Sequence, residues 1–214
     1  MTAELDKKLS TLFDADRAQR RATAAFFESG DERALVAALG RAIEAALALD
    51  DEEESAERLM RVGDLLGEVG GPAAIVHLIG LLDHDEPGVR VSAGEALLEL
   101  GHSRYAEVAR EFEKAIDAGT KTAALSEIPY LLAEIGEPGG VKLCARLLRH
   151  ADPDVVGAAI EALAALGDPS VIKDIEKLRN DKRAVPQEEE LDTGEVTVGE
   201  LAQEAIEHLR SLKD

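Results

Sequence analysis

The sequence predicts an all-α fold in which antiparallel helix pairs stack into a superhelix. Segments rich in Ala and Leu align in register, and each ends at a glycine; these glycines are Gly70, Gly101, Gly136 and Gly167. A proline follows three of them, and these prolines are Pro72, Pro138 and Pro169. Proline can start a helix because the N–H that it lacks would be unpaired at the first helical position anyway. A two-helix repeat of this length is typical of an α-solenoid, whose units bury their apolar faces against their neighbours.

The composition supports this fold class. Aromatic residues make up only 3% of the 214 residues and Trp is absent. A β-sandwich or barrel needs more aromatic and β-branched residues than this, whereas closely packed helices do not. Because the core of a solenoid runs from end to end, we expect a single domain over 1–214.

Alignment on the closing glycines predicts six helix pairs. We place them at 1–30, 31–70, 71–101, 102–136, 137–167 and 168–214. In the second helices, apolar rows place Leu97 and Leu163 in the core, and Phe26 and Ala22 occupy the matching positions of the first pair. Pro129 falls inside a second helix, where it predicts a kink or a later helix start.

The last pair departs from the pattern. Residues 181–197 predict an exposed acidic loop with a short hairpin at Asp192–Gly194. The chain then returns to helix through a capping box formed by Thr197 and Glu200. The polar helix that follows is expected to cap the open end of the stack.

These segments resemble HEAT repeats of the short bacterial type, the PBS-lyase HEAT-like repeats. The best match runs from Asp85 through Pro87, Val89 and Arg90 to Gly101, and residues 152–167 match except for Val156 in place of the arginine. The resemblance covers about 71–180. It implies a fold and little chemistry, since relatives include scaffolds, chromophore lyases, a DNA glycosylase group and an iron-dependent hydroxylase.

Candidate catalytic and metal-binding residues are few. The hydroxylase relatives carry His-Glu steps, which this sequence lacks. His84 and His150 occupy equivalent turns two repeats apart, or about 20 Å at the usual helix spacing, so one metal cannot bridge them. Cys144 shares its row with Leu78 and Ile175, which predicts a small buried hydrophobe rather than a nucleophile. We therefore expect no enzyme activity, no catalytic residue, no cofactor and no metal.

Charge and length narrow the partner and the compartment. The formal net charge is −20, which repels nucleic acids and anionic membranes and attracts basic proteins. The N-terminus lacks a signal-peptide core, the longest apolar stretch is too short for a bilayer, and the one cysteine agrees with a reducing compartment. We expect a cytoplasmic, monomeric protein that binds neither nucleic acid nor membrane.

Acidic side chains recur on the second helices, on the face opposite the core rows. We predict this face to be the protein-binding site, and its residues are Glu28, Glu68, Glu99 and Glu134 in one row and Asp64, Glu95, Tyr130 and Glu161 in the next. Solenoids bind partners along such a face, although Glu is also common on solvated helix surfaces. Toward the N-terminus the sign changes at Arg17, Arg20, Arg21, Arg58 and Arg61, which either orient a partner or pair with local acids.

The sequence thus predicts a non-enzymatic scaffold or adaptor that binds a basic protein through an acidic concave face. An inhibitor or immunity-type protein that masks a basic active site is a narrower form of this prediction. The alternative from another class is a chromophore (bilin) lyase-like enzyme, which requires a pocket with a specific acid or thiol.

Overall fold

The computed structural model describes residues 2–185 and 196–212, with side chains from residue 4 onward, and this part of the chain is all-α apart from one pair of two-residue strands. The predicted fold class is confirmed. The elements are α1 Thr2–Glu28, α2 Glu32–Leu47, α3 Glu52–Val69, α4 Gly71–Leu81, α5 Pro87–Ala118, α6 Thr122–Ile135, α7 Gly139–Leu147, α8 Pro153–Leu166, the 3-10 turn η1 Pro169–Val171, α9 Ile172–Ile175, the 3-10 turn η2 Glu176–Leu178, β1 Ala184–Val185, β2 Val196–Thr197 and α10 Val198–Ser211.

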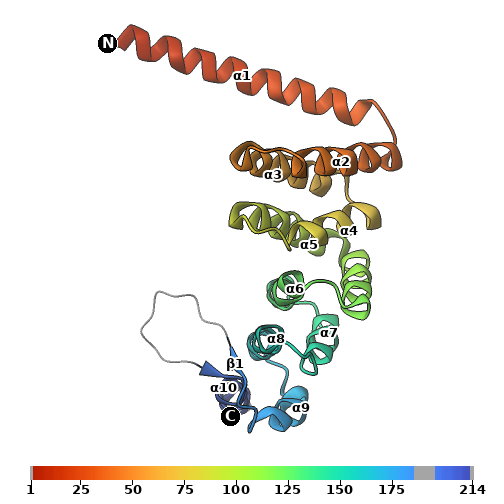
Figure 1. The fold of residues 1–214 in the computed structure, drawn as a ribbon, viewed down its shortest axis with the longest axis vertical. Helices are drawn as coiled ribbons and strands as arrows, with labels where there is room; N and C mark the ends of the chain where they lie inside the picture. The colour runs from red at the N-terminus through yellow and green to blue at the C-terminus, as the bar shows by residue number, and fades with distance from the viewer. Residues whose placement is uncertain (1, 186–195, 213–214) are drawn as a thin grey trace.

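From α2 onward the helices form a stack with two sides (Figure 1). The second helices α3, α6, α8 and α10 lie on the left in that view, together with the first half of α5. The first helices α2, α4, α7 and α9 lie on the right with the second half of α5. The side of the second helices is also the side toward which α1 projects.

A continuous core joins the two sides of the stack. Leu97 and Leu163 have no exposed surface, and the same holds for Leu66 and Leu132 at the matching positions of α3 and α6. Cys144 on α7 is likewise fully buried, among the apolar residues of the core.

The prediction that Gly101 ends a helix is wrong. Gly70, Gly136 and Gly167 end their helices with φ of 69°, 72° and 69°, a region that disfavours other residues, but Gly101 remains inside α5. The break comes instead at Arg104, where φ is −141° and ψ is 43°. A Cβ atom on Gly101 would lie 2.3 Å from Cδ1 of Ile135, so the glycine is needed for the close approach of α6 rather than for a turn.

The helix pair predicted over 1–30 is also not formed. Residues 2–28 are one uninterrupted helix, α1, and none of its described side chains is buried. Ala22 is exposed and Phe26 only half-buried, so the core row that was extended into this segment stops at α3. The segment between Asp14 and Arg21 is rich in Ala, Arg and Gln, and it contains no helix-breaking residue that could form the turn of a pair.

The second helix of the fourth pair, α6, begins at Thr122 and runs through Pro129, so of the two predicted alternatives, a kink and a later start, the later start is wrong. In the last pair the first helix is reduced to η1, α9 and η2. The strands β1 and β2 then pair antiparallel, Ala184 with Thr197 and Val185 with Val196, beside α8 and α10. The predicted turn at Asp192–Gly194 lies outside the described residues. The capping box of Thr197 and Glu200 is present at the start of α10.

Within the described residues, no helix combines the length and hydropathy needed to cross a membrane.

Candidate protein-binding surface

Seven of the eight residues in the predicted acidic rows lie on neighbouring second helices, and all seven are exposed. Asp64 and Glu68 are on α3, Glu95 and Glu99 on the first half of α5, Tyr130 and Glu134 on α6, and Glu161 on α8. These four helices pack side by side in that order, so the rows run along the stack rather than around one helix. We call the set of Asp64, Glu68, Glu95, Glu99, Tyr130, Glu134 and Glu161 the acidic stripe.

Two contacts fix the spacing of the stripe between helices. The Tyr130 hydroxyl donates to Oε2 of Glu161 at 2.7 Å, which joins α6 to α8. The Ser92 hydroxyl of α5 lies 3.4 Å from Oδ1 of Asp64 and 3.1 Å from the Met60 carbonyl oxygen, which joins α5 to α3. These hydrogen bonds link neighbouring helices, so the stripe is part of the packed stack.

Tyr130 combines an exposed ring with a fixed hydroxyl. Its side chain is exposed at 45% and belongs to α6, next to the buried Pro129. Partial burial and, after it, the hydrogen bond to Glu161 raise the pKa of Tyr130, so its hydroxyl stays protonated and remains a donor. The ring therefore offers an apolar contact in the middle of an otherwise acidic surface.

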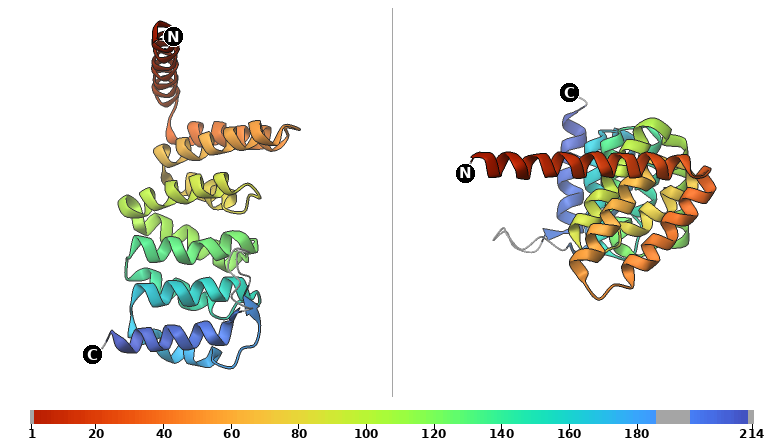
Figure 2. Two further views of the ribbon diagram at one scale, coloured as in Figure 1. Left: turned by 90° about the vertical axis from the view of Figure 1, so that its left-hand side faces the viewer. Right: turned by 90° about the horizontal axis from the view of Figure 1, so that it is seen from above.

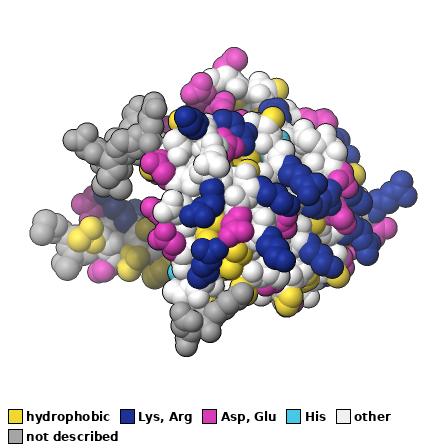
Figure 3. Space-filling model, turned by 90° about the horizontal axis from the view of Figure 1, so that it is seen from below, with side chains coloured by type: hydrophobic (Ala, Val, Ile, Leu, Met, Phe, Trp, Pro, Cys, Tyr) yellow, Lys and Arg dark blue, Asp and Glu magenta, His cyan; other side chains and the backbone are white. Residues whose placement is uncertain are grey.

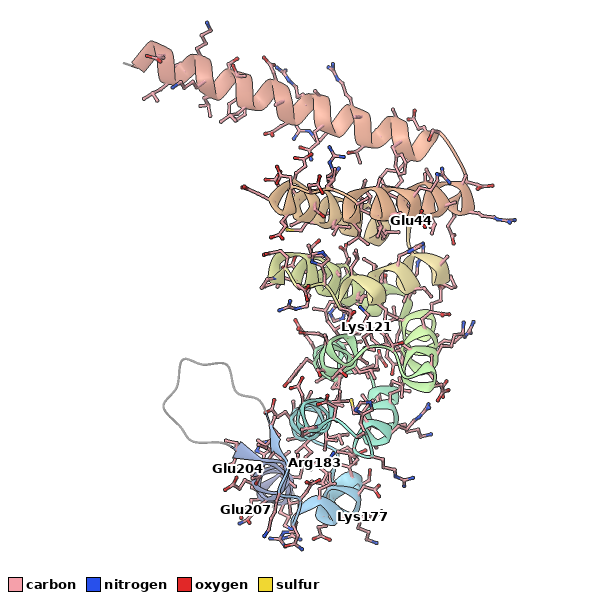
Figure 4. The ribbon with its side chains drawn as sticks, viewed as in Figure 1. Glu44, Lys121, Lys177, Arg183, Glu204 and Glu207 are labelled. Carbon is pink, nitrogen blue, oxygen red and sulfur yellow. The ribbon has the colours of Figure 1, made fainter. Side chains whose placement is uncertain are left out.

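The binding face predicted from the sequence included Glu28, which is not part of the acidic stripe, and left out Glu207. Glu28 is the last residue of α1, which is not the second helix of a pair, so the repeat argument does not apply to it. Glu207 is exposed on α10, beside α8, and Figure 4 shows it with Glu204 on the left-hand side of the molecule, the side of the second helices. The signal was present in the sequence, because residues 159–163 read AIEAL and residues 205–209 read AIEHL, which aligns Glu207 with Glu161.

The predicted arginines at the N-terminal end are largely held by local acids. Arg58 pairs with Glu54 at 2.6 Å and Arg17 with Asp14, one turn away on the same helix. Arg61 bridges to the Thr23 hydroxyl of α1 at 2.7 Å and contacts Asp64 at 3.5 Å. Arg20 and Arg61 line a groove of about 500 Å³ between α1 and α3, together with Phe27 and Glu68.

A basic surface that the sequence analysis missed lies at the other end of the stack. Figure 3 views the C-terminal end and shows Lys and Arg side chains gathered there. The residues of α7 through η2 and their flanking turns include Lys142, Arg146, Arg149, Lys173, Lys177 and Arg179. A cavity of about 450 Å³ opens between Arg146, Arg149 and Lys177, but Arg146 pairs with Glu113 and Asp117, and Lys177 pairs with Asp174 at 2.6 Å.

The candidates for catalysis or metal binding, Cys144, His84 and His150, are buried or hydrogen-bonded within the fold. Burial raises the pKa of the Cys144 thiol to about 12, so it is not available as a thiolate near neutral pH. Nδ1 of His84 accepts the backbone N–H of Glu86 at 3.0 Å, and Nδ1 of His150 accepts that of Asp152 at 3.1 Å. Across the described part of the chain, no three His, Cys, Asp or Glu side chains are grouped as metal ligands.

Comparison with known proteins identifies the repeat. Residues 123–189 match the family model of HEAT repeats. This segment is therefore similar to HEAT repeats. The resemblance that the sequence motifs indicated is therefore confirmed, although the matched HEAT segment ends before α10 and begins after α5. No curated protein matches the chain at a significant level.

The solved structures that resemble this chain include engineered and designed proteins. Two crystal structures of engineered proteins have 20% and 22% identity, TM-scores of 0.39 and 0.40, and coverage of 91% of this chain and 91% and 93% of their own. A designed armadillo repeat protein has 20% identity and a TM-score of 0.37, with 89% of this chain and 94% of its own covered.

Proposed function

We propose that this chain is a non-enzymatic scaffold or adaptor that binds a basic protein segment along the acidic stripe. The observation that carries the proposal is the stripe itself, a series of exposed carboxylates around Tyr130 on four adjacent second helices, of which α6 and α8 lie in the segment that matches the HEAT-repeat model. Solenoid repeats present such long, rigid faces to partners, and the position of each side chain is set by the repeat spacing.

Electrostatics supports a basic partner. The net charge of −20 creates a field that accelerates the encounter with a positively charged surface and slows that with a phosphate backbone. The ring of Tyr130 supplies what a row of carboxylates lacks, an apolar contact at the centre of the surface, and tyrosine is enriched among residues that dominate binding energy. The same surface could mask a basic active site, which is the inhibitor form of this proposal.

The proposal is tested by reversing charges within the stripe. The Glu99→Lys/Glu134→Lys variant should fold like the wild type, because both side chains are exposed, and should lose binding several-fold or more. A matched control is Glu32→Lys/Glu44→Lys, which makes the same charge change at two exposed residues of the first helix α2; Figure 4 labels Glu44. Basic proteins captured from native lysate by the wild type are identified first, and their association rates are then measured at low and moderate salt.

The expected result is a slower association of the stripe variant, a near-normal association of the control, and a wild-type rate that falls as salt rises. If stripe and control variants lose affinity equally, only the overall charge matters and the stripe is not the site. Tyr130→Phe and Tyr130→Ala separate two roles of the ring. Loss of affinity only in Tyr130→Ala identifies the ring as a contact, whereas loss of stability without loss of affinity identifies it as a packing residue.

A further inference from the structure

Helix α1 exposes a row of large apolar side chains that nothing in the described chain covers. Leu5, Leu9, Leu12 and Phe13 are exposed at 60%, 49%, 62% and 55%. Their spacing of four, three and one residues places them on one side of a helix. We call these four residues the α1 stripe.

The α1 stripe lies where the helix extends beyond the stack. Figures 1 and 2 show α1 crossing the N-terminal end of the stack, with its N-terminal part projecting past the edge. Eighteen residues make about five helical turns, so Thr23 lies on the same side as Leu5, and Phe27 on the same side as Leu9. The Thr23 hydroxyl accepts a hydrogen bond from Arg61 of α3, and Phe27 lines the groove between α1 and α3. The side of α1 that rests on the stack in its C-terminal part is therefore the side left bare in its N-terminal part.

We expect the exposed apolar side of α1 to bind a partner. Most of the stability of a protein helix comes from packing its apolar face, and adjacent exposed leucines and phenylalanines mark interaction surfaces. At about 40 Å, α1 is long enough to form a substantial contact along its length.

The charge of α1 indicates what that partner is. Residues 2–28 contain five basic side chains, at Lys7, Lys8, Arg17, Arg20 and Arg21, and five acidic ones, at Glu4, Asp6, Asp14, Asp16 and Glu28. The helix is thus neutral, and the whole net charge of −20 is carried by the rest of the chain. A basic partner gains nothing from binding this helix, whereas two copies of the chain can meet here without the repulsion that their stacks would impose.

We propose that the α1 stripe binds the α1 stripe of a second copy of this chain, in an antiparallel helix pair. This pairing replaces the monomer that the sequence predicted, and it does not depend on the acidic stripe, which remains open. The flanking charges select the antiparallel direction. By the helical repeat, Asp6 and Arg17 border the stripe on the same flank, whereas Asp16, four residues after Leu12 and seven after Leu9, continues the line of the stripe. Antiparallel pairing brings the same flanks together and sets Asp6 near Arg17 of the second copy, whereas parallel pairing in register sets the two Asp16 carboxylates against each other.

A two-fold axis between Ser10 and Thr11 fits this arrangement. It sets Leu9 against Leu12 of the second copy and repeats the same contact on the other side of the axis, as a self-complementary dimer interface requires. Ser10 and Thr11 point away from the stripe by their position on the helix. They therefore serve as a control site one residue from the contact.

The first experiment measures mass in solution by sedimentation and light scattering. The wild type should have twice the 22.8 kDa of one chain, and the Leu9→Glu/Leu12→Glu variant should be a monomer with an unchanged unfolding transition of the stack. Ser10→Glu/Thr11→Glu adds the same charge on the opposite side and should remain a dimer. A monomeric wild type at high protein concentration overturns the proposal, as does a Leu9→Glu/Leu12→Glu variant that still dimerises.

The second experiment tests the direction of the pair. Leu9→Cys protein is mixed with Leu12→Cys protein under oxidising conditions, and the buried Cys144 does not compete for the new thiols. Antiparallel pairing predicts that the mixed disulfide forms several-fold faster than either disulfide between identical variants. Faster crosslinking between identical variants would overturn the antiparallel arrangement. Because neither experiment touches the acidic stripe, failure here leaves the proposed function standing, and failure of the charge-reversal test leaves this dimer standing.

Discussion

Two turns with the same sequence pattern are closed in different ways. The turn at residues 84–88 and the turn at residues 150–154 both begin with histidine and place proline at the start of the next helix. In the first, Nη1 of Arg90 donates to the carbonyl oxygens of His84 (2.8 Å) and Asp85 (2.9 Å), six and five residues away. In the second, Val156 stands at the arginine position, and Nη1 of Arg183 donates to the carbonyl oxygens of His150 (3.2 Å) and Ala151 (2.7 Å).

The second turn therefore receives its guanidinium from a residue 32 positions or more further along the chain. Arg183 is held in place by Asp181, whose carboxylate accepts from Nε and from Nη2 at 2.6 Å. The strand β1 that follows packs on α8, where Val156 is fully buried. Figure 4 labels Arg183 beside β1. A missing motif residue therefore does not imply a missing contact, because the next unit of a stack can supply the same group.

The largest effect is expected when the motif arginine is restored. Val156→Arg places a charge in a site with no exposed surface, and the carbonyls it would bind are already occupied by Arg183. We expect a loss of at least about 3 kcal/mol in the free energy of unfolding. Urea denaturation measures this, with Val156→Met as the control for size alone. A second variant, Val156→Arg/Arg183→Ala, should recover part of the loss if the two arginines compete for the same carbonyls.

A smaller effect is expected when each arginine is removed. Arg183→Ala should cost about 2 kcal/mol because charge-assisted hydrogen bonds are lost between distant segments, and Arg90→Ala should cost about 1 kcal/mol because it closes only its own turn. Hydrogen exchange distinguishes the two variants. The amides of α10 should exchange faster in Arg183→Ala and be unaffected in Arg90→Ala, and equal exchange of α10 in both would contradict the long-range role of Arg183.

The two turns should also differ in their response to pH. The side-chain hydrogen bond from Arg183 lowers the pKa of Asp181, assisted by the Arg183 backbone N–H. A carboxyl whose folded-state pKa is lowered stabilises the fold above its ordinary pKa of about 3.9, and this contribution is lost as pH falls through the folded-state value. The stability difference between the wild type and Asp181→Asn should therefore be complete at neutral pH and shrink below about pH 4. A difference that is constant with pH would show that the Arg183 contact does not depend on the charge of Asp181.

The smallest effect is expected at the two histidines, where the turns are alike. Each ring accepts one backbone N–H, so His84→Ala and His150→Ala should each cost about 0.5–1 kcal/mol. The variants His84→Asn and His150→Asn keep an acceptor suited to turns and should restore most of the loss. Thermal unfolding compares all four. A much larger loss at His150 alone would mean that its ring, and not only the carbonyls, depends on Arg183.

Much of the fold follows from local sequence patterns. The apolar rows correctly placed Leu97, Leu163 and Cys144 in the core, because helical spacing decides which side of a helix faces its neighbour. The acidic stripe was found in the same way. Glu207 was missed because the last helix, which has no closing glycine, was interpreted as a polar cap and was not aligned with the other second helices on their shared Ala-Ile-Glu step.

Other features depend on what each segment meets in space. Gly101 has the sequence of a helix end, yet α5 continues past it. A glycine is required at this position because the side chain of Ile135 leaves no room for a Cβ atom. Apolar spacing in α1 looks like that of a core helix, but amphipathic periodicity shows only that one side is apolar and not whether a neighbour covers it.

The sequence by itself therefore determined the repeat from α2 onward, the helical faces and the helix ends at Gly70, Gly136 and Gly167, since these depend on interactions over a few residues. Tertiary structure decided that α1 leaves its apolar stripe uncovered and that Arg183 closes the turn at His150. Both outcomes depend on which segments meet across tens of residues, and no local spacing encodes that.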